Sequence, residues 1–291
     1  MKLLKDAAIA PLEGTMDSFT GGVYSSAGQF IEDSLLDRGK PAQLQETTEY
    51  LPDMYIYGGC LFANFGHFIW ESLARLYTIR QCKEFPILFI SPNDTVFTVQ
   101  KLFLTAIGIR NAIHIVKAPT HIKNLLYSPP GSSIHPLYIT EEQIEALACL
   151  HFPHENTDRK IWLSRSRLKL GRLLNEAAIE SALEKCGFEI VYPETLPIRE
   201  QVRLISTSRI VAGCDGSQFF SFLFAKEIQG KFFVCNRRKN IPKTIPYALE
   251  KRNIDFSLHV FDLEQRDGEG AEHNFYLPSP ERIVDILSEY T

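Results

Sequence analysis

At residues 209–228 the chain reads RIVAGCDGSQFFSFLFAKEI. The apolar run 210–212 predicts a buried strand, 213–217 a tight turn with two glycines, and 218–228 a helix that is apolar on most of its faces. In a parallel α/β sheet this order brings free backbone N–H groups and the positive end of a helix dipole to the carboxyl edge of the sheet. The turn therefore predicts a site for an anionic ligand. The alternative is that its glycines serve only the turn.

Strands and helices alternate around this stretch. Residues 161–164 and 188–192 predict strands, and a further strand follows the quoted stretch. The helices between them are one that Asn175 caps and Gly187 ends, and one over 198–206. Four strands with three crossing helices make a doubly wound half on their own.

The first half of the chain shows a shorter version of the same pattern. Residues 86–91 predict a strand, 96–107 a helix and 112–117 another strand, which is βαβ order. Another helix is predicted before them, beginning just after Gly66. Residues 1–60 are harder to interpret: 21–28 suggest short strands and turns and 54–57 a strand, and no chemistry is assigned to them.

A Pro/Gly/Ser cluster at 128–133 predicts the domain boundary near the middle of the chain. We therefore expect an α/β protein with two Rossmann-like domains, 1–132 and 133–278, that face each other across a cleft. A capping box at 140–143 opens a helix in the second domain. Residues 279–291 predict a terminal helix, for which we expect packing on the first domain.

The composition is that of an ordinary soluble protein. The 291 residues are 45% hydrophobic and 23% charged, with a net charge of -4. We find no basic face interleaved with aromatic residues, which argues against a nucleic-acid partner. Six cysteines without a C-x-x-C pair predict free thiols in a reducing compartment.

The N-terminus also bears on location. Lys2, Lys5 and Asp6 interrupt the apolar stretch that a signal peptide would need, and no window reaches the length of a membrane span. We expect a cytoplasmic protein that can still visit a membrane surface through a partner or substrate.

Several short blocks follow one another in a fixed order. They are Asn64-Phe65-Gly66-His67-x-x-x-Glu71, Trp162-Leu163-Ser164-Arg165-Ser166 with Arg172 and Asn175-Glu176, Gly187-Phe188-Glu189-Ile190-Val191-x-Pro193-Glu194, Glu200-Gln201, and Ile210-Val211-Ala212-Gly213-x-Asp215-Gly216-Ser217. In this order and spacing, over about 55–235, the chain resembles the family 61 glycosyltransferases. Within that family it is most similar to the bacterial branch linked to capsule and surface polysaccharide synthesis.

The resemblance implies a GT-B fold and inverting sugar transfer without an obligatory metal or other cofactor. The expected donor is a nucleotide sugar, UDP-linked, held by the C-terminal domain, and the expected acceptor is a glycan or lipid-linked glycan on the N-terminal side. The chain departs from the eukaryotic pattern at Asp215, where a His is usual, and at Glu71, where an Asp is common. Two alternatives stay open: a GT-B-like nucleotide-sugar epimerase, and a catalytically silent binding or scaffold protein.

The donor side needs groups that relieve the charge growing on the departing diphosphate. Arg165 and Arg172 are both expected at the carboxyl edge of the sheet, where guanidinium groups can grip two oxygens at once. We expect them to bind the diphosphate together with the turn at Gly213, Gly216 and Ser217. The alternative is that they are surface arginines on a solvated loop.

The acceptor side needs a group that removes the proton of the acceptor hydroxyl. His67 and Glu71 are four residues apart and share one side of the predicted helix, with Asn64 just before it. Either His67 is the base and Glu71 orients it, or Glu71 is itself the base. A structural role for His67 at the helix start is the alternative. A metal site is the weaker interpretation, because the sequence offers no well-placed third ligand.

Two further acidic residues lie near the expected cleft. Glu194 follows a strand end and is a candidate acceptor for a ribose hydroxyl or a base edge. Asp215 lies in the turn itself, and we expect it to contact sugar hydroxyls or the N–H groups of the turn.

Overall fold

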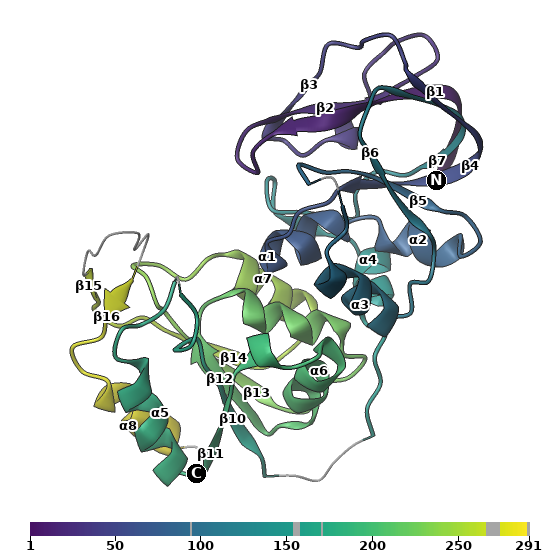
Figure 1. Ribbon diagram of the computed structural model, residues 1–291. Coiled ribbons are helices and arrows are strands. Elements are labelled where there is room, and N and C mark those ends of the chain that lie inside the picture. The colour runs from purple at the N-terminus through teal and green to yellow at the C-terminus, as the bar shows by residue number, and fades with distance from the viewer. Residues whose placement is uncertain (94, 154–157, 170, 266–273, 290–291) are drawn as a thin grey trace. The chain divides into compact units, whose positions relative to one another are not determined.

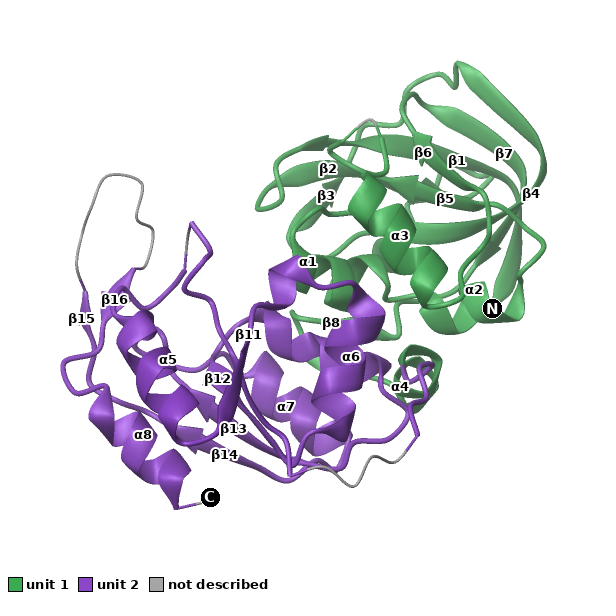
Figure 2. Cartoon of the chain, turned by 60° about the horizontal axis from the view of Figure 1, so that its bottom comes forward, with its two compact units in different colours: residues 1–147 green, residues 148–291 purple. Residues whose placement is uncertain are grey.

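The computed structural model describes residues 1–93, 95–153, 158–169, 171–265 and 274–289 (Figure 1). The chain divides into two compact units, Met1–Leu147 and Ala148–Thr291 (Figure 2). The division falls after Leu147 and not at residue 132. Gln143 shows why, because its side chain donates to the carbonyl of Leu73 at 2.7 Å and accepts from the N–H of Tyr77 at 3.3 Å.

The described residues of the first unit form a mixed sheet of seven strands in the order β3-β2-β1-β7-β4-β5-β6. Strand β1 runs antiparallel to both of its neighbours, whereas β7, β4, β5 and β6 run parallel to one another. The first half is therefore α/β, but its sheet is not parallel throughout. The strands are β1 (Lys2–Gly14), β2 (Phe19–Tyr24), β3 (Gly39–Pro41), β4 (Glu49–Cys60), β5 (Ile87–Ile90), β6 (Ile113–Val116) and β7 (Thr120–Tyr127), with a separate pair β8 (Ser132–Ser133) and β9 (Tyr138–Ile139).

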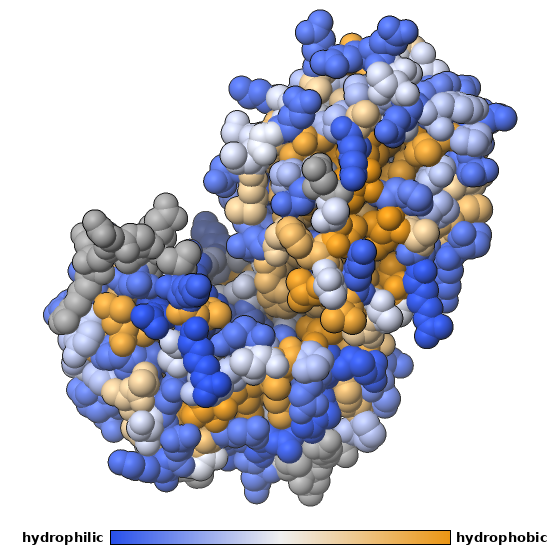
Figure 3. Space-filling view, viewed as in Figure 1, coloured by the Kyte–Doolittle hydropathy of each residue, from blue (hydrophilic) through white to orange (hydrophobic). Residues whose placement is uncertain are grey.

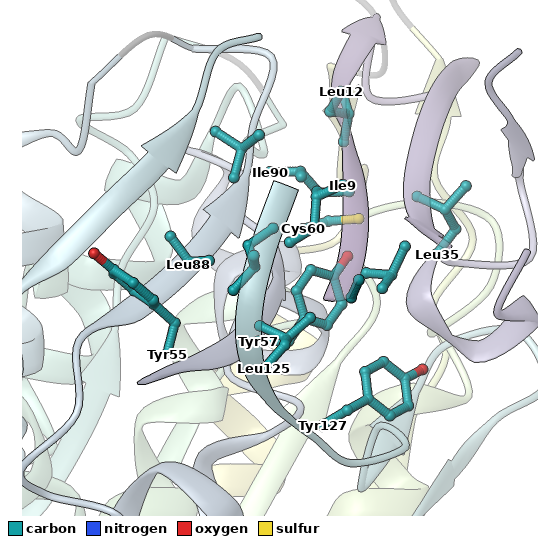
Figure 4. Packing of buried hydrophobic residues seen from close by; sticks show 14 of the residues in the cluster. Ile9, Leu12, Leu35, Tyr55, Tyr57, Cys60, Leu88, Ile90, Leu125 and Tyr127 are labelled. Carbon is teal, nitrogen blue, oxygen red and sulfur yellow. The ribbon is translucent and has the colours of Figure 1, made fainter. Parts of the chain in front are cut away.

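Side chains from β1, β2, β4, β5, β6 and β7 of this sheet pack into one core (Figure 4). Ile9, Tyr57, Ile90 and Leu125 come from β1, β4, β5 and β7, and each is fully buried. Burial of a side chain of this size contributes about 1.5–3 kcal/mol to folding. This core joins the N-terminal strands, which the sequence predicted only in part, to the predicted βαβ segment.

The helices of the first unit are short. The helix predicted to begin after Gly66 begins at Phe65, with Asn64 as its N-cap, and widens after His67 into a π-helical turn. Such π-turns often occur at functional sites. The helical segments are η1 (Glu32–Ser34), α1 (Phe65–His67), η2 (Phe68–Ser72), α2 (Leu76–Gln81), α3 (Thr98–Ala106) and α4 (Glu141–Leu147).

The described residues of the second unit form the doubly wound sheet that the sequence predicts. Five parallel strands lie in the order β11-β10-β12-β13-β14. The chain order reverses between β10 and β12, and ligands of such sheets bind where the carboxyl ends of the strands meet this switch point. The strands are β10 (Lys160–Leu163), β11 (Phe188–Val191), β12 (Ile210–Cys214), β13 (Lys231–Cys235) and β14 (Phe256–His259), with a small pair β15 (Glu264–Gln265) and β16 (Phe275–Tyr276).

Helices cover both faces of this sheet (Figures 1 and 2). The terminal helix α8 packs beside α5, and its buried residues Ile283 and Leu287 share a core cluster with Ile179 and Leu183 of α5. The terminal helix therefore packs within the second unit. The expectation that it packs on the first domain was wrong. The helical segments are α5 (Glu176–Lys185), η3 (Pro193–Thr195), α6 (Ile198–Thr207), the 3₁₀ segment η4 (Ser217–Phe224), α7 (Thr244–Lys251) and α8 (Glu281–Ser288).

Two local predictions differ from the structure. The helix expected over 218–228 is a 3₁₀ segment that ends at Phe224, because the chain beyond it pairs with Leu150 through hydrogen bonds of 2.8 Å on either side. The side chain of Asn175 does not cap α5. It bonds instead to the backbone N–H and carbonyl of Leu277, which anchors the segment before α8.

Candidate functional site

Arg165 lies at the switch point of the second unit, where it connects the end of β10 with the segment that follows β12. It follows β10, and its side chain is 9% exposed. Its Nη1 donates to Oε1 of Gln218 at 2.6 Å, and Gln218 in turn donates to the carbonyl of Cys214 at the end of β12. Its Nε donates to the carbonyl of Gly171 at 2.8 Å. The structure thus brings Arg165 to the 213–217 turn.

Two glycines make room for this guanidinium group. A Cβ at Gly216 would collide with the side chains of Arg165 and Gln218. A Cβ at Gly171 would come within 3.4 Å of Arg165 Nη2 and 2.9 Å of Arg237 Nη1, and its φ of +66° also favours glycine. The glycines therefore serve the arginine site as well as the turn.

Asp215 lies in the turn as expected, but its hydrogen-bond partners differ from the expected ones. It is fully buried, its Oδ1 accepts from the backbone N–H of Arg237 at 2.7 Å, and its Oδ2 accepts from Nε of Arg238 at 3.0 Å. Its carbonyl accepts from Nε of Arg237 at 2.7 Å. The carboxylate of Asp215 therefore points toward the loop after β13. It fixes the two arginines that follow β13.

The second unit thus gathers positive charge at one edge of its sheet. Burial, followed by the nearby positive charge of Arg165, lowers the pKa of Arg237 to about 10. Burial likewise lowers the pKa of Arg165. The lowered pKa values mean that the negative groups of the protein do not fully offset the burial and mutual repulsion of these positive charges. A bound anion would therefore be stabilised there.

Glu176 lies beneath Arg165 and was given no role by the sequence. Its Oε1 accepts from the indole Nε1 of Trp162 at 3.2 Å and from the backbone N–H of Arg165 at 3.1 Å. Within the described residues its Oε2 is buried and has no hydrogen-bond partner. Burial raises the pKa of this carboxyl to about 7.

The other residues predicted for the donor side lie at the same edge but are less tightly connected. Ser217 begins η4 and is half-buried, and Glu194 is exposed in η3, which follows β11. Arg172 donates from Nη1 to the carbonyl of Ser166 at 3.1 Å. In the part of the chain that the structure describes, no hydrogen bond or ion pair joins Arg172 or Glu194 to Arg165.

A second group of functional side chains lies in the first unit. Nδ1 of His67 is 2.7 Å from Oε2 of Glu71, and Arg38 grips both oxygens of that carboxylate, at 2.6 and 2.7 Å. Glu71 is buried, whereas the side chain of His67 is 29% exposed. Asn64 contributes through its Oδ1, which accepts from the N–H groups of Gly66 and His67.

The hydrogen bonds of Glu71 assign its role. Burial alone would raise its pKa, but the bonds from Arg38 and His67 outweigh burial and lower it. An ionised carboxylate only accepts hydrogen bonds, so Nδ1 of His67 donates to it, and Nε2 is the ring nitrogen that can accept a proton. The geometry therefore favours His67 over Glu71 as a base, with Glu71 and Arg38 holding the ring in place.

The family model described as Glycosyltransferase 61 matches residues 65–230. The chain belongs to glycosyltransferase family 61. A search of curated proteins found no match.

The family match spans both groups of side chains. This family 61 glycosyltransferase has His67 and Glu71 near the start of the matched segment and Arg165 and Gly216 in its second half. A glycosyltransferase takes a sugar donor and a glycan acceptor, so the chain acts on these two classes of substrate. Arg38 and Arg237 lie outside the matched segment.

No group of three or more His, Cys, Asp or Glu side chains in the described ranges is arranged to hold a metal ion. None of the helices in those ranges has the length and apolar character that a bilayer crossing requires.

The raised pKa of Glu176 predicts a pH-dependent effect of Glu176→Gln on stability. An unfolded glutamate ionises near 4.5 and the native one near 7, so the wild type loses stability as the pH rises between these values. Gln keeps the Oε1 acceptor and does not titrate. We expect the stability of Glu176→Gln relative to wild type to rise by about 2–3 kcal/mol between pH 5 and pH 8, measured by urea unfolding.

Glu184→Gln is the matched control, because Glu184 is exposed on the same helix. Its difference from wild type should vary little over this range. A pH-independent difference for Glu176→Gln would show that Glu176 is already ionised at pH 5 in the native protein.

Proposed function

We propose that this glycosyltransferase moves a sugar from a UDP-linked donor to a glycan or lipid-linked glycan acceptor, with inversion and without a metal or other cofactor. We propose that it acts on the cytoplasmic side in the synthesis of a bacterial capsule or surface polysaccharide. The observation that carries the proposal is the fixed position of Arg165 across the switch point of a parallel sheet, in a chain of this family.

On the donor side, the departing diphosphate gains negative charge as the bond to the anomeric carbon breaks. Arg165 and Arg172 supply charge-assisted hydrogen bonds for it, and the backbone at Gly213, Gly216 and Ser217 supplies N–H groups. Glu194, exposed beyond β11, is proposed to meet the ribose or the base. The preorganisation of Arg165 by Gln218 supports this assignment, since no reorganisation is needed when charge develops.

On the acceptor side, His67 is the proposed base. The acceptor oxygen attacks the anomeric carbon from the face opposite the diphosphate, its proton passes to Nε2 of His67, and the electron pair of the broken C–O bond leaves with the phosphate. The bond between Nδ1 of His67 and the ionised Glu71 stabilises the imidazolium that forms.

This mechanism requires both groups of side chains to act on one donor–acceptor pair. We therefore propose the GT-B arrangement, with the first unit on the acceptor side and the second unit on the donor side. Peripheral contact with a membrane face is part of the proposal. It is supported by Val99 and Leu102 of α3, which are 70% and 65% exposed. Figure 3 shows apolar surface among the hydrophilic residues of the first unit.

The proposal is tested by a donor panel followed by a product assay. UDP-, GDP- and CMP-linked ligands are screened by thermal shift, and the donor that binds is incubated with and without glycan acceptors. We expect a UDP-linked donor to bind and to be consumed only with an acceptor. Conversion of the sugar without an acceptor would indicate an epimerase, and the absence of any shift would indicate a silent binding protein.

Arg38 is proposed as a positioning residue for the base. Replacement by Ala removes both bonds to Glu71 and leaves a buried carboxylate whose negative charge favours the protonated form of His67. We expect Arg38→Ala to lower kcat/KM by roughly 10- to 100-fold and to move the acid limb of its pH profile to higher pH.

Arg38→Lys is the comparison, since it keeps the charge but not the two parallel bonds. Its acid limb should lie closer to that of wild type than the limb of Arg38→Ala. An unchanged pH profile in Arg38→Ala would contradict the positioning role, even if total activity fell.

A further inference from the structure

Arg237 and Arg238 follow β13 and are assigned to no role by the family match, which ends at residue 230. Strand pairing places them near the turn, because Cys235 lies opposite Cys214 in the parallel β12–β13 register. The N–H of Asp215 donates to the carbonyl of Cys235 at 2.7 Å and holds the two strand ends together. The loop after β13 is thereby fixed against the 213–217 turn.

Asp215 orients both arginines without using up their hydrogen-bonding capacity. The carboxylate of Asp215 accepts hydrogen bonds from Nε of Arg238 and from the backbone N–H of Arg237. The backbone carbonyl of Asp215 accepts a hydrogen bond from Nε of Arg237. Among the described residues, the Nη atoms of both arginines make no hydrogen bond to protein. These atoms are therefore available to a ligand.

The arginines form a group with Arg165. Arg237 Nη1 and Arg165 Nη2 both come within 3.4 Å of the position that a side chain on Gly171 would take. Arg237 and Arg238 form ion pairs with the fully buried carboxylate of Asp215, at 3.8 and 3.0 Å, and among the described residues no ion pair joins that carboxylate to Arg165. Positive charge that is partly buried and incompletely paired is costly, so the group favours a ligand with more than one negative charge.

We propose that Arg237 and Arg238 bind the terminal phosphate of the nucleoside diphosphate beside Arg165, and that Asp215 is the buried residue that orients them. This rests on the proposed function and deepens it. A nucleoside diphosphate has a second phosphate that the monophosphate lacks, so the arginines discriminate between the two. The same contacts strengthen as charge builds on the departing phosphate during transfer.

The test measures the affinity of the variants for a nucleoside diphosphate and for its monophosphate by calorimetry. The probe is whichever of UDP, GDP and CDP binds the wild type most tightly. We expect Arg238→Gln to weaken diphosphate binding by roughly 10- to 100-fold and monophosphate binding by no more than about threefold. Arg237→Gln should do the same. The side chain of Arg238 is 39% exposed, so we expect Arg238→Gln to fold even if Arg237→Gln does not. In that case the diphosphate affinity of Arg238→Gln alone tests the proposal.

Lys239→Ala is the matched control, because it removes a positive charge from the same loop at an exposed position. Its affinity should stay within about twofold of wild type. If Arg238→Gln binds the diphosphate like wild type while Arg165→Ala does not, this inference is overturned and the proposed function stands. If the wild type binds none of the three diphosphates nor inorganic pyrophosphate, both fall.

Discussion

His67→Ala is expected to lower kcat by about 10²- to 10⁴-fold, the range that a positioned general base contributes. The structure gives the physical reason. The ring is held by Glu71 at 2.7 Å so that Nε2 is the free acceptor, and 29% of the side chain is exposed, which lets an acceptor hydroxyl reach it. Steady-state kinetics at saturating donor and acceptor measure the loss.

The affinity for the donor separates catalysis from folding in this variant. His67 belongs to the first unit, so the binding of UDP by the arginines of the second unit should change by no more than about twofold. His121→Ala is the matched control. His121 also lies near a carboxylate, that of Asp6 at 3.3 Å, and is partly exposed, but it is not part of the proposed site. Near-full turnover in His67→Ala would rule out the base assignment.

The sequence predicted the central strands of the second unit well, because β10, β12 and β13 are buried along nearly their whole length. Such strands appear as continuous apolar runs, and β12 is buried at every residue. The first unit was harder to predict. Strand β1 has polar residues along an exposed half, and Asp6 within it has a φ of +53° that breaks the regular alternation. Its pairing with β7, over a hundred residues away, is fixed by tertiary contacts that no local pattern records.

The same distinction between local and distant contacts applies to the candidate site. His67 and Glu71 were found because a helical spacing of four residues is visible in sequence. Arg38 was not found, since it lies 33 residues before Glu71 and only the folded chain brings them together. The position of Asp215 was predicted, but its partners depend on the register between β12 and β13.

Arg165→Ala is expected to weaken the binding of UDP by about 100-fold and to lower kcat/KM by about 10³-fold. A charged hydrogen bond contributes about 1.5–3 kcal/mol to binding, and loss of a group that stabilises developing charge costs a comparable amount again. Arg167→Ala is the matched control, because Arg167 is two residues away and exposed, with its guanidinium 3.5 Å from the ring centre of Tyr192. Its affinity for UDP should stay close to that of wild type.

Arg165 also has structural partners, so stability must be measured alongside binding. Ala leaves the carbonyl of Gly171 and Oε1 of Gln218 without their donor, which we expect to destabilise the second unit by about 1–3 kcal/mol. Arg165→Lys keeps a positive charge and can recover part of that stability, but an ammonium group cannot hold two protein acceptors and two phosphate oxygens in one plane. A variant with Lys that is as stable as wild type yet shows a much smaller thermal shift with UDP would therefore assign Arg165 to the ligand. Full binding of UDP by Arg165→Ala would remove the observation on which the proposed function rests.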